Sequence, residues 1–123
     1  MMKRLLLILV AFVLMSFNEV VTSVIGAFTK ADANKVSSYF DNSIGVRAPG
    51  EFEFRIQPRQ QATRWLNTFF VEKNITGFEQ TSVNTVEDYT LIQGRLISSA
   101  RKYPIAIRIN KVGDTYKIAS IKF

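Results

Sequence analysis

One segment near the middle of the chain constrains the fold most, because its apolar residues follow the period of an α-helix. Between residues 58 and 74 the apolar positions fall at i, i+3, i+4, i+7 and i+8, namely Ala62, Trp65, Leu66, Phe69 and Phe70. Pro58 suits the first turn of this helix, and Asn74 can end it. A helix with a single apolar stripe buries that stripe against another layer, so the segment predicts a long helix lying across a sheet.

The chain after this helix alternates apolar and polar residues with a period of two, which is typical of β-strands. The expected strands cover residues 78–83, 89–97, 105–110 and 116–123. Gly94 marks either a bulge or a close approach of two backbones, and Gly113-Asp114 forms a hairpin turn. These strands are expected to pair in antiparallel order.

Two shorter helices and a small hairpin precede the long helix. Apolar residues of segment 19–28 lie on one helical stripe, and Asp32 can cap a second helix that extends to residue 40. Residues 51–56 alternate apolar and charged side chains, which predicts a half-buried strand paired with residues 44–48. The whole order predicts an α+β domain: a curved antiparallel sheet with the N-terminal helices and the long helix on its concave face, and a more polar opposite face.

The first residues have the pattern of a secretory signal. Lys3 and Arg4 precede an unbroken apolar run over residues 5–15. This run is shorter than the roughly 20 residues that span a bilayer. We therefore expect a signal peptide over residues 1–18, a single domain over residues 19–123, and export to the periplasm or the extracellular space. The alternative is an uncleaved, membrane-associated segment.

The composition excludes several classes of chemistry. The chain has no His and no Cys, which removes the usual nucleophilic triads, most zinc sites, haem ligation and disulfides. We expect no metal and no cofactor. Without Lys3 and Arg4, 14 basic residues stand against 10 acidic ones, a net charge of +4 (16 − 2 − 10). The basic residues are dispersed, so no nucleic-acid partner is expected.

Several short motifs, in this order of elements, resemble a known family. They are Ile25-Gly26-Ala27-Phe28, Val36 with Tyr39-Phe40-Asp41, Gln61-Ala62 with Phe69-Phe70, and Tyr89 with Gly94-Arg95-Leu96. In them the chain is similar to small exported bacterial proteins grouped as domain of unknown function 4783, and more broadly to the nuclear-transport-factor-two-like, or cystatin-like, cone fold. The motifs are packing and turn residues, so the resemblance implies the fold and no particular activity.

The resemblance also indicates where a ligand site would lie, because enzymes of the cone fold use a pocket between the long helix and the concave sheet. The polar and aromatic candidates for that pocket are Tyr39, Trp65, Tyr89, Arg95 and Arg108. An Arg beside aromatic rings can hold a carboxylate or a phosphate. The alternative is that the rings are core and the Arg side chains reach solvent.

Three kinds of function remain open. The expected one is a non-enzymatic binding or interaction module, with a small anionic or apolar ligand in the pocket, or with a second copy of the chain or an envelope protein as its partner. A His-independent enzyme would need a buried carboxylate within hydrogen-bond reach of a Tyr hydroxyl. The carboxylate pairs Glu51/Glu53 and Glu87/Asp88 are instead expected on a solvated strand face and in a turn. An accessory subunit of an envelope assembly would need a contiguous exposed apolar patch.

Overall fold

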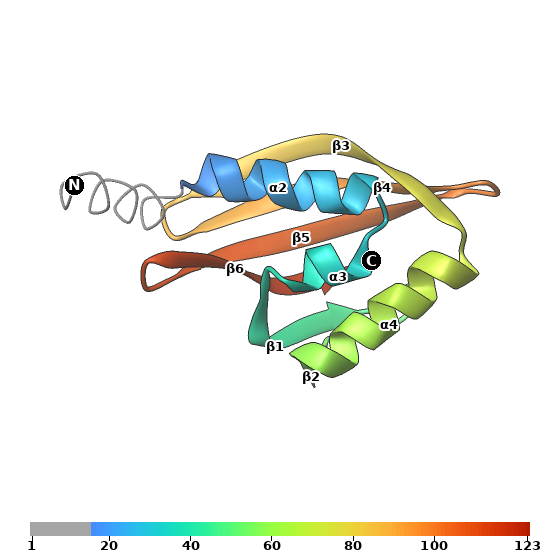
Figure 1. Cartoon of the computed structure of the whole chain (residues 1–123), viewed down its shortest axis with the longest axis horizontal. Coiled ribbons are helices and arrows are strands. Elements are labelled where there is room, and N and C mark those ends of the chain that lie inside the picture. Colours follow the sequence, from blue (N-terminus) through green and yellow to red (C-terminus); the bar gives the residue numbers. More distant parts are fainter. Residues whose placement is uncertain (1–15) are drawn as a thin grey trace, which may run out of the picture.

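The computed structural model describes residues 16–123, which form three helices and six strands (Figure 1). The helices are α2 (Phe17–Thr29), α3 (Ala33–Ser37) and α4 (Arg59–Glu72). The strands are β1 (Phe40–Arg47), β2 (Arg55–Pro58), β3 (Ile75–Val86), β4 (Tyr89–Ser98), β5 (Lys102–Val112) and β6 (Thr115–Lys122). The predicted signal peptide lies almost wholly outside the described residues. Within 16–123, no helix combines the length and the apolar character that a membrane crossing requires.

The six strands form one curved sheet in the order β2-β1-β6-β5-β4-β3. Neighbours are antiparallel except for β1 and β6, which run parallel. A parallel pair needs a long connection, and here the connection includes α4 and four strands, β2 to β5. The parallel pair joins the β1–β2 hairpin to β6, the last strand of the chain.

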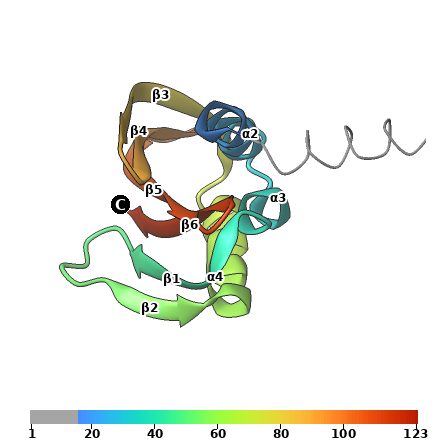
Figure 2. The same cartoon turned by 90° about the vertical axis from the view of Figure 1, so that its left-hand side faces the viewer.

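The helices cover one face of this sheet. In Figure 2, α2 lies beside β3 and β4, while α3 and α4 lie on the same side near β1. Facing the helices, side chains at alternate strand positions are buried, such as Ile105, Ile107 and Ile109 of β5. The predicted stripe of α4 is confirmed, because Ala62, Leu66, Phe69 and Phe70 are buried. The α+β fold with helices on one face is therefore as predicted.

Local caps explain where the helices begin and end. The Ser16 hydroxyl accepts a hydrogen bond from the backbone N–H of Glu19 at the start of α2. The predicted cap of α3 is confirmed, since Asp32 Oδ1 accepts from the N–H of Lys35 at 3.1 Å. Asn74, just after α4, has a φ of 51°, the left-handed conformation that often follows a helix.

The strands predicted over 78–83 and 105–110 extend further at both ends, as β3 and β5, and two other predicted boundaries are wrong for a tertiary reason. The second helix ends at Ser37, and the residues from Phe40 onward join β1, because the N–H of Ile118 in β6 donates to the Tyr39 carbonyl. The predicted strand over 51–56 begins only at Arg55. The last residue of β1 that pairs with β2 is Val46, so residues 51–54 have no partner strand and form a loop.

Gly94 illustrates how tightly two of the strands pack. A Cβ atom added at Gly94 would lie 2.5 Å from both the Glu79 carbonyl oxygen and the Phe78 ring. Beside it, the β3–β4 register shifts between Gln80 and Ser82. The predicted close approach at Gly94 is therefore confirmed.

Substituting Gly94 should cost stability, and substituting Gly26 should add it. We expect Gly94→Ala to destabilise the fold by about 1–3 kcal/mol, because the methyl group meets backbone and a buried ring. Gly26 lies inside α2 with nothing within 4 Å of its added Cβ, so Gly26→Ala should stabilise by about 0.5–1 kcal/mol. Urea denaturation measures both; equal effects of the two variants would show that the packing at Gly94 is looser than described.

The apolar stripe of α4 makes a second prediction. Phe69 is 7% exposed and its ring contacts those of Tyr103 and Phe123, so Phe69→Ala should cost about 3–5 kcal/mol. Trp65 is only partly buried, so Trp65→Ala should cost less. Val71 on the same helix is 71% exposed, and Val71→Ala should change the free energy of unfolding by less than about 0.5 kcal/mol. Denaturant titration of the three variants would contradict this packing if Val71→Ala were the most damaging.

Candidate functional site

The sheet face opposite the helices, here called the open face, carries polar side chains in register. Gln93 of β4 lies opposite Ala106 of β5, Ala106 opposite Lys122 of β6, and Lys122 opposite Arg47 of β1. Paired residues on neighbouring strands point to the same side of a sheet. The row therefore crosses four strands, and the small Ala106 stands between the longer Lys122 and Gln93.

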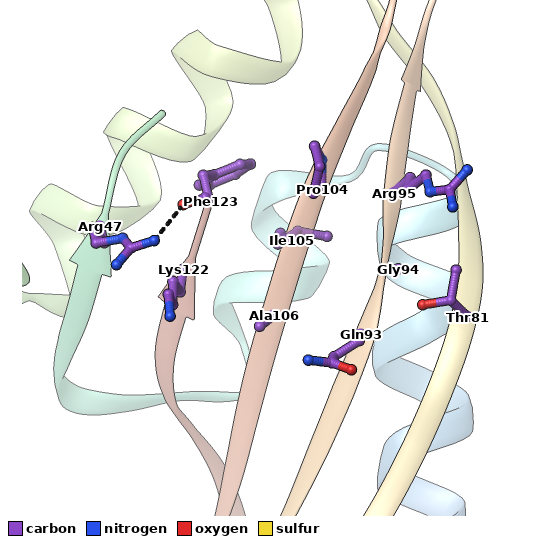
Figure 3. A pocket seen from close by; sticks show the side chains of 10 residues that line it. All are labelled: Arg47, Thr81, Gln93, Gly94, Arg95, Pro104, Ile105, Ala106, Lys122 and Phe123. Atoms are coloured by element: carbon purple, nitrogen blue, oxygen red, sulfur yellow. Dashed lines mark hydrogen bonds between the residues drawn. The ribbon is translucent and has the colours of Figure 1, made fainter. Parts of the chain in front are cut away.

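A hollow of about 410 Å³ lies over this row (Figure 3). Its lining residues come from five strands and the end of the chain: Arg47, Thr81, Gln93, Gly94, Arg95, Pro104, Ile105, Ala106, Lys122 and Phe123. In Figure 3, Arg47 and Lys122 stand on one side of the hollow, and Arg95 and Thr81 on the other. Three of the lining side chains are cationic and none is acidic.

Arg47 is held in place by the end of β6. Its Nη2 donates to the Phe123 carbonyl oxygen at 3.3 Å, and the Phe123 N–H donates to the Arg47 carbonyl at 2.9 Å. The Nε atom of Arg47 is buried and bonds to no group among residues 16–123. The guanidinium is thus fixed while part of its donor capacity stays unused.

An ion-pair cluster lies beside the hollow, next to Arg95. Glu79 of β3 pairs with Arg95 at 3.8 Å and with Lys102 of β5 at 3.0 Å. The pKa of Glu79 is lowered, first by the hydrogen bond from Lys102, then by the charge of Lys102; desolvation opposes this, and Arg95 adds a smaller lowering. Arg95 and Lys102 therefore share Glu79 as an acidic partner.

The structure brings together some of the sequence-predicted site residues, but not all five. Arg95 lines the hollow on the open face. Tyr89 and Arg108 belong to the same face: the Arg108 guanidinium lies 4.0 Å from the centre of the Tyr89 ring, and its Nε donates to Asn110 Oδ1. Neither residue lines the hollow.

The other two predicted residues lie away from the open face. Trp65 stacks on Phe69 within α4 and meets the Phe123 ring edge-on. Tyr39 lines a separate shallow depression beside α2 and α3. Buried side chains of α4 and the sheet fill the space where a cone-fold pocket was expected, including Leu66, Ile107 and Ile118.

Sequence reasoning missed Arg47, Lys122 and Thr81. Strand periodicity already groups Gln93 with Arg95, since they are two residues apart on one strand. No local pattern links Arg47 with Lys122, which are 75 positions apart and meet only through the parallel pairing of β1 with β6. Identifying these residues as neighbours therefore required the tertiary structure.

No Asp or Glu side chain among residues 16–123 is buried. The only buried polar or charged side chains in the described part of the chain are Ser37 and Thr90, so no Asp or Glu is buried beside a Tyr hydroxyl. Glu51 pairs with Arg55, and Glu87 and Asp88 form the β3–β4 turn. Over residues 16–123, no group of three or more His, Cys, Asp or Glu side chains is placed to hold a metal ion.

A curved, unclosed sheet with helices on one face defines the cystatin-like, NTF2-like class of α+β domains. An uncharacterized cystatin-fold protein from Novosphingobium aromaticivorans superimposes with a TM-score of 0.68 at 16% identity, over 89% of this chain and 97% of that one. An NTF2-like protein of unknown function from Cytophaga hutchinsonii gives a TM-score of 0.61 at 7% identity, over 88% of each chain.

A family model described as domain of unknown function (DUF4783) matches residues 21–123, and the chain belongs to this family. A DUF4783 protein from Bacteroides ovatus shares the fold with a TM-score of 0.76 at 21% identity, over 81% of this chain and 89% of that one. Comparison with curated proteins finds no match. The resemblance expected from the sequence is confirmed, and these likenesses extend to the fold alone.

The ion-pair cluster makes a prediction about pH. The lowered pKa of Glu79 means that its stabilising contribution is present above the pKa of an unfolded Glu and is lost as the pH falls through the folded value. Glu79→Gln should therefore reduce stability at neutral pH, and the difference from wild type should vanish in acid. Urea denaturation between about pH 7 and about pH 3 measures this. Glu72→Gln is the control; the prediction fails if both variants show the same pH profile.

Proposed function

We propose that this domain is a non-enzymatic binding module that takes a small anionic ligand, bearing a carboxylate or a phosphate, in the hollow on the open face. The observation that carries the proposal is the placement of Arg47, Lys122 and Arg95 around one hollow with no acidic side chain in its lining. Its volume of about 410 Å³ is within the usual range of small-molecule sites, about 300–1,000 Å³.

The donor set suits such a ligand. Lys122 offers a flexible ammonium group, Arg95 a planar fork, and Gln93 and Thr81 add neutral polar groups. The Phe123 oxygen occupies one Arg47 donor, and Glu79 partly neutralises Arg95, so Lys122 is the cation of the three whose side chain has no hydrogen bond and no ion pair among the described residues. Ala106 leaves room between the charged side chains, which favours a compact anion over a long chain.

The signal-like segment at the start of the chain indicates the compartment in which the domain would bind its ligand. We infer that the domain meets its ligand after export, in the periplasm or outside the cell. The absence of a buried carboxylate from the described residues removes the support for the His-independent enzyme, which was the alternative.

The proposal is tested by titrating ¹⁵N-labelled protein with inorganic phosphate and, separately, acetate, at an ionic strength held constant with sodium chloride. The amide signals of Lys122, Ala106 and Gln93 should shift together and saturate. Lys122→Ala should weaken binding about tenfold, because a charge-assisted hydrogen bond is lost.

Lys111→Ala is the matched control. Lys111 is an exposed Lys of β5 that does not line the hollow, and its loss changes the net charge equally. Equal weakening by both variants would mean general charge attraction, and an absence of saturable shifts would mean that the hollow is not a site for either anion. Native mass spectrometry of the protein from its own cells would then identify a retained ligand.

A further inference from the structure

The sequence contains a strand pattern that the single chain does not use. Residues 51–56 alternate charged and apolar side chains, yet β2 begins only at Arg55. The apolar members are the most exposed large apolar cluster in the described part: Phe52 is 95% exposed, Ile56 74% and Phe54 46%. An exposed segment with a strand pattern beside a sheet edge favours pairing with another strand.

The position of this segment permits such pairing. In the described part of the chain, β2 ends the sheet, with β1 on one side and no strand on the other (Figure 2). Phe54 and Ile56 lie against Gly45 on the open face, at 3.4 and 3.6 Å from where its Cβ would stand. Phe54 and Ile56 therefore sit at the edge of the open face, and the exposed Phe52 precedes them in the loop; these three side chains are here called the hairpin strip (Phe52, Phe54 and Ile56).

We propose that two copies of this chain associate through their β2 edges, antiparallel and in register about Phe54, with residues 51–54 of each copy joining the strand. Such a two-fold interface must be complementary to itself. This inference concerns a different surface from the anion site and does not depend on it.

One register of the two strands is self-complementary for both the apolar and the charged side chains. With Phe54 opposite Phe54 of the other copy, Phe52 faces Ile56, so the two hairpin strips form one apolar cluster. On the alternate positions, Glu53 faces Arg55 and Glu51 faces Gln57, so opposite charges meet and like charges do not. An antiparallel edge pair keeps both open faces on the same side, so the apolar cluster stays continuous.

The rest of the hairpin is consistent with a short and limited contact. Pro58 ends β2 and has no N–H to donate, so pairing does not extend past it. Among the described residues, the one ion pair of Arg55 is with Glu51 of the preceding loop, at 3.6 Å and largely in solvent. An interface of one strand edge is small, so we expect dimers that form in the micromolar to millimolar range.

Cysteine cross-linking tests the register directly, because the chain has no Cys. Opposed residues of antiparallel strands have Cα atoms about 4.5–5.5 Å apart, which suits a disulfide. Phe54→Cys should therefore form a covalent dimer at least about tenfold faster than Val71→Cys, an exposed apolar control on α4. Phe52→Cys alone should not link, since the two thiols lie about 13 Å apart along the strands.

The mixture of Phe52→Cys and Ile56→Cys chains should give the mixed disulfide, whereas Ile56→Cys alone should not link. If Phe54→Cys links no faster than Val71→Cys, or if the mixed disulfide does not exceed the homodimers, the register is wrong. Either result overturns the proposal.

A charge exchange gives an independent test in the protein without Cys. Glu53→Arg and Arg55→Glu should each weaken self-association about three- to tenfold, and the double variant should restore it. The double variant does not restore the internal Glu51–Arg55 pair, so recovery reports on contacts between copies. Sedimentation velocity from about 10 µM to about 1 mM measures this; a wild type that stays monomeric throughout, or singles that bind as well as wild type, would overturn the proposal.

Discussion

The parallel pairing of β1 with β6 is the contact on which the rest of this structure depends. It is fixed at both ends by backbone hydrogen bonds: the N–H of Ile118 donates to the Tyr39 carbonyl at 2.7 Å, and the N–H of Phe123 donates to the Arg47 carbonyl at 2.9 Å. Without it, the β1–β2 hairpin would have no backbone pairing to the four-stranded meander. With it, the sheet gains two strands, α4 gains a surface to cover, and Arg47 comes beside Lys122.

Burial on one face explains why the candidate site lies on the other. The helices bring a large set of apolar side chains onto the sheet, and those side chains fill the space where the sequence led us to expect a pocket. Charged groups are costly to bury, so the strand positions that face away from the helices carry Arg, Lys and Gln. A hollow forms there because Ala106 is small and its neighbours Gln93 and Lys122 are long.

The open face therefore combines two features of different chemistry. The cationic hollow lies over β4, β5, β6 and the end of β1, while the hairpin strip lies at the β2 edge. Arg47 is the last residue of β1, and the hairpin strip begins five residues later at Phe52 (52 − 47), so the hollow and the strip are neighbours along the chain. A small anion suits the first and a second strand edge suits the second, and each can be tested without disturbing the other.

The sequence by itself determined the elements whose cause is local. The stripe of α4, the Asp32 cap, the close approach at Gly94 and the Gly113 turn all follow from periodicity or from the conformational needs of single residues, and all are present. Strand alternation also groups Arg95 with Gln93, but the sequence led us to expect Arg95 in a pocket under the long helix, whereas it lies on the open face. What the sequence could not determine was which distant segments meet. Arg47 joins Lys122, Phe40 leaves its helix for β1, and residues 51–54 stay unpaired because one strand order places β1 beside β6 and leaves β2 at the edge. That order is set by the burial of side chains from the whole chain at once, so only the tertiary structure decided it.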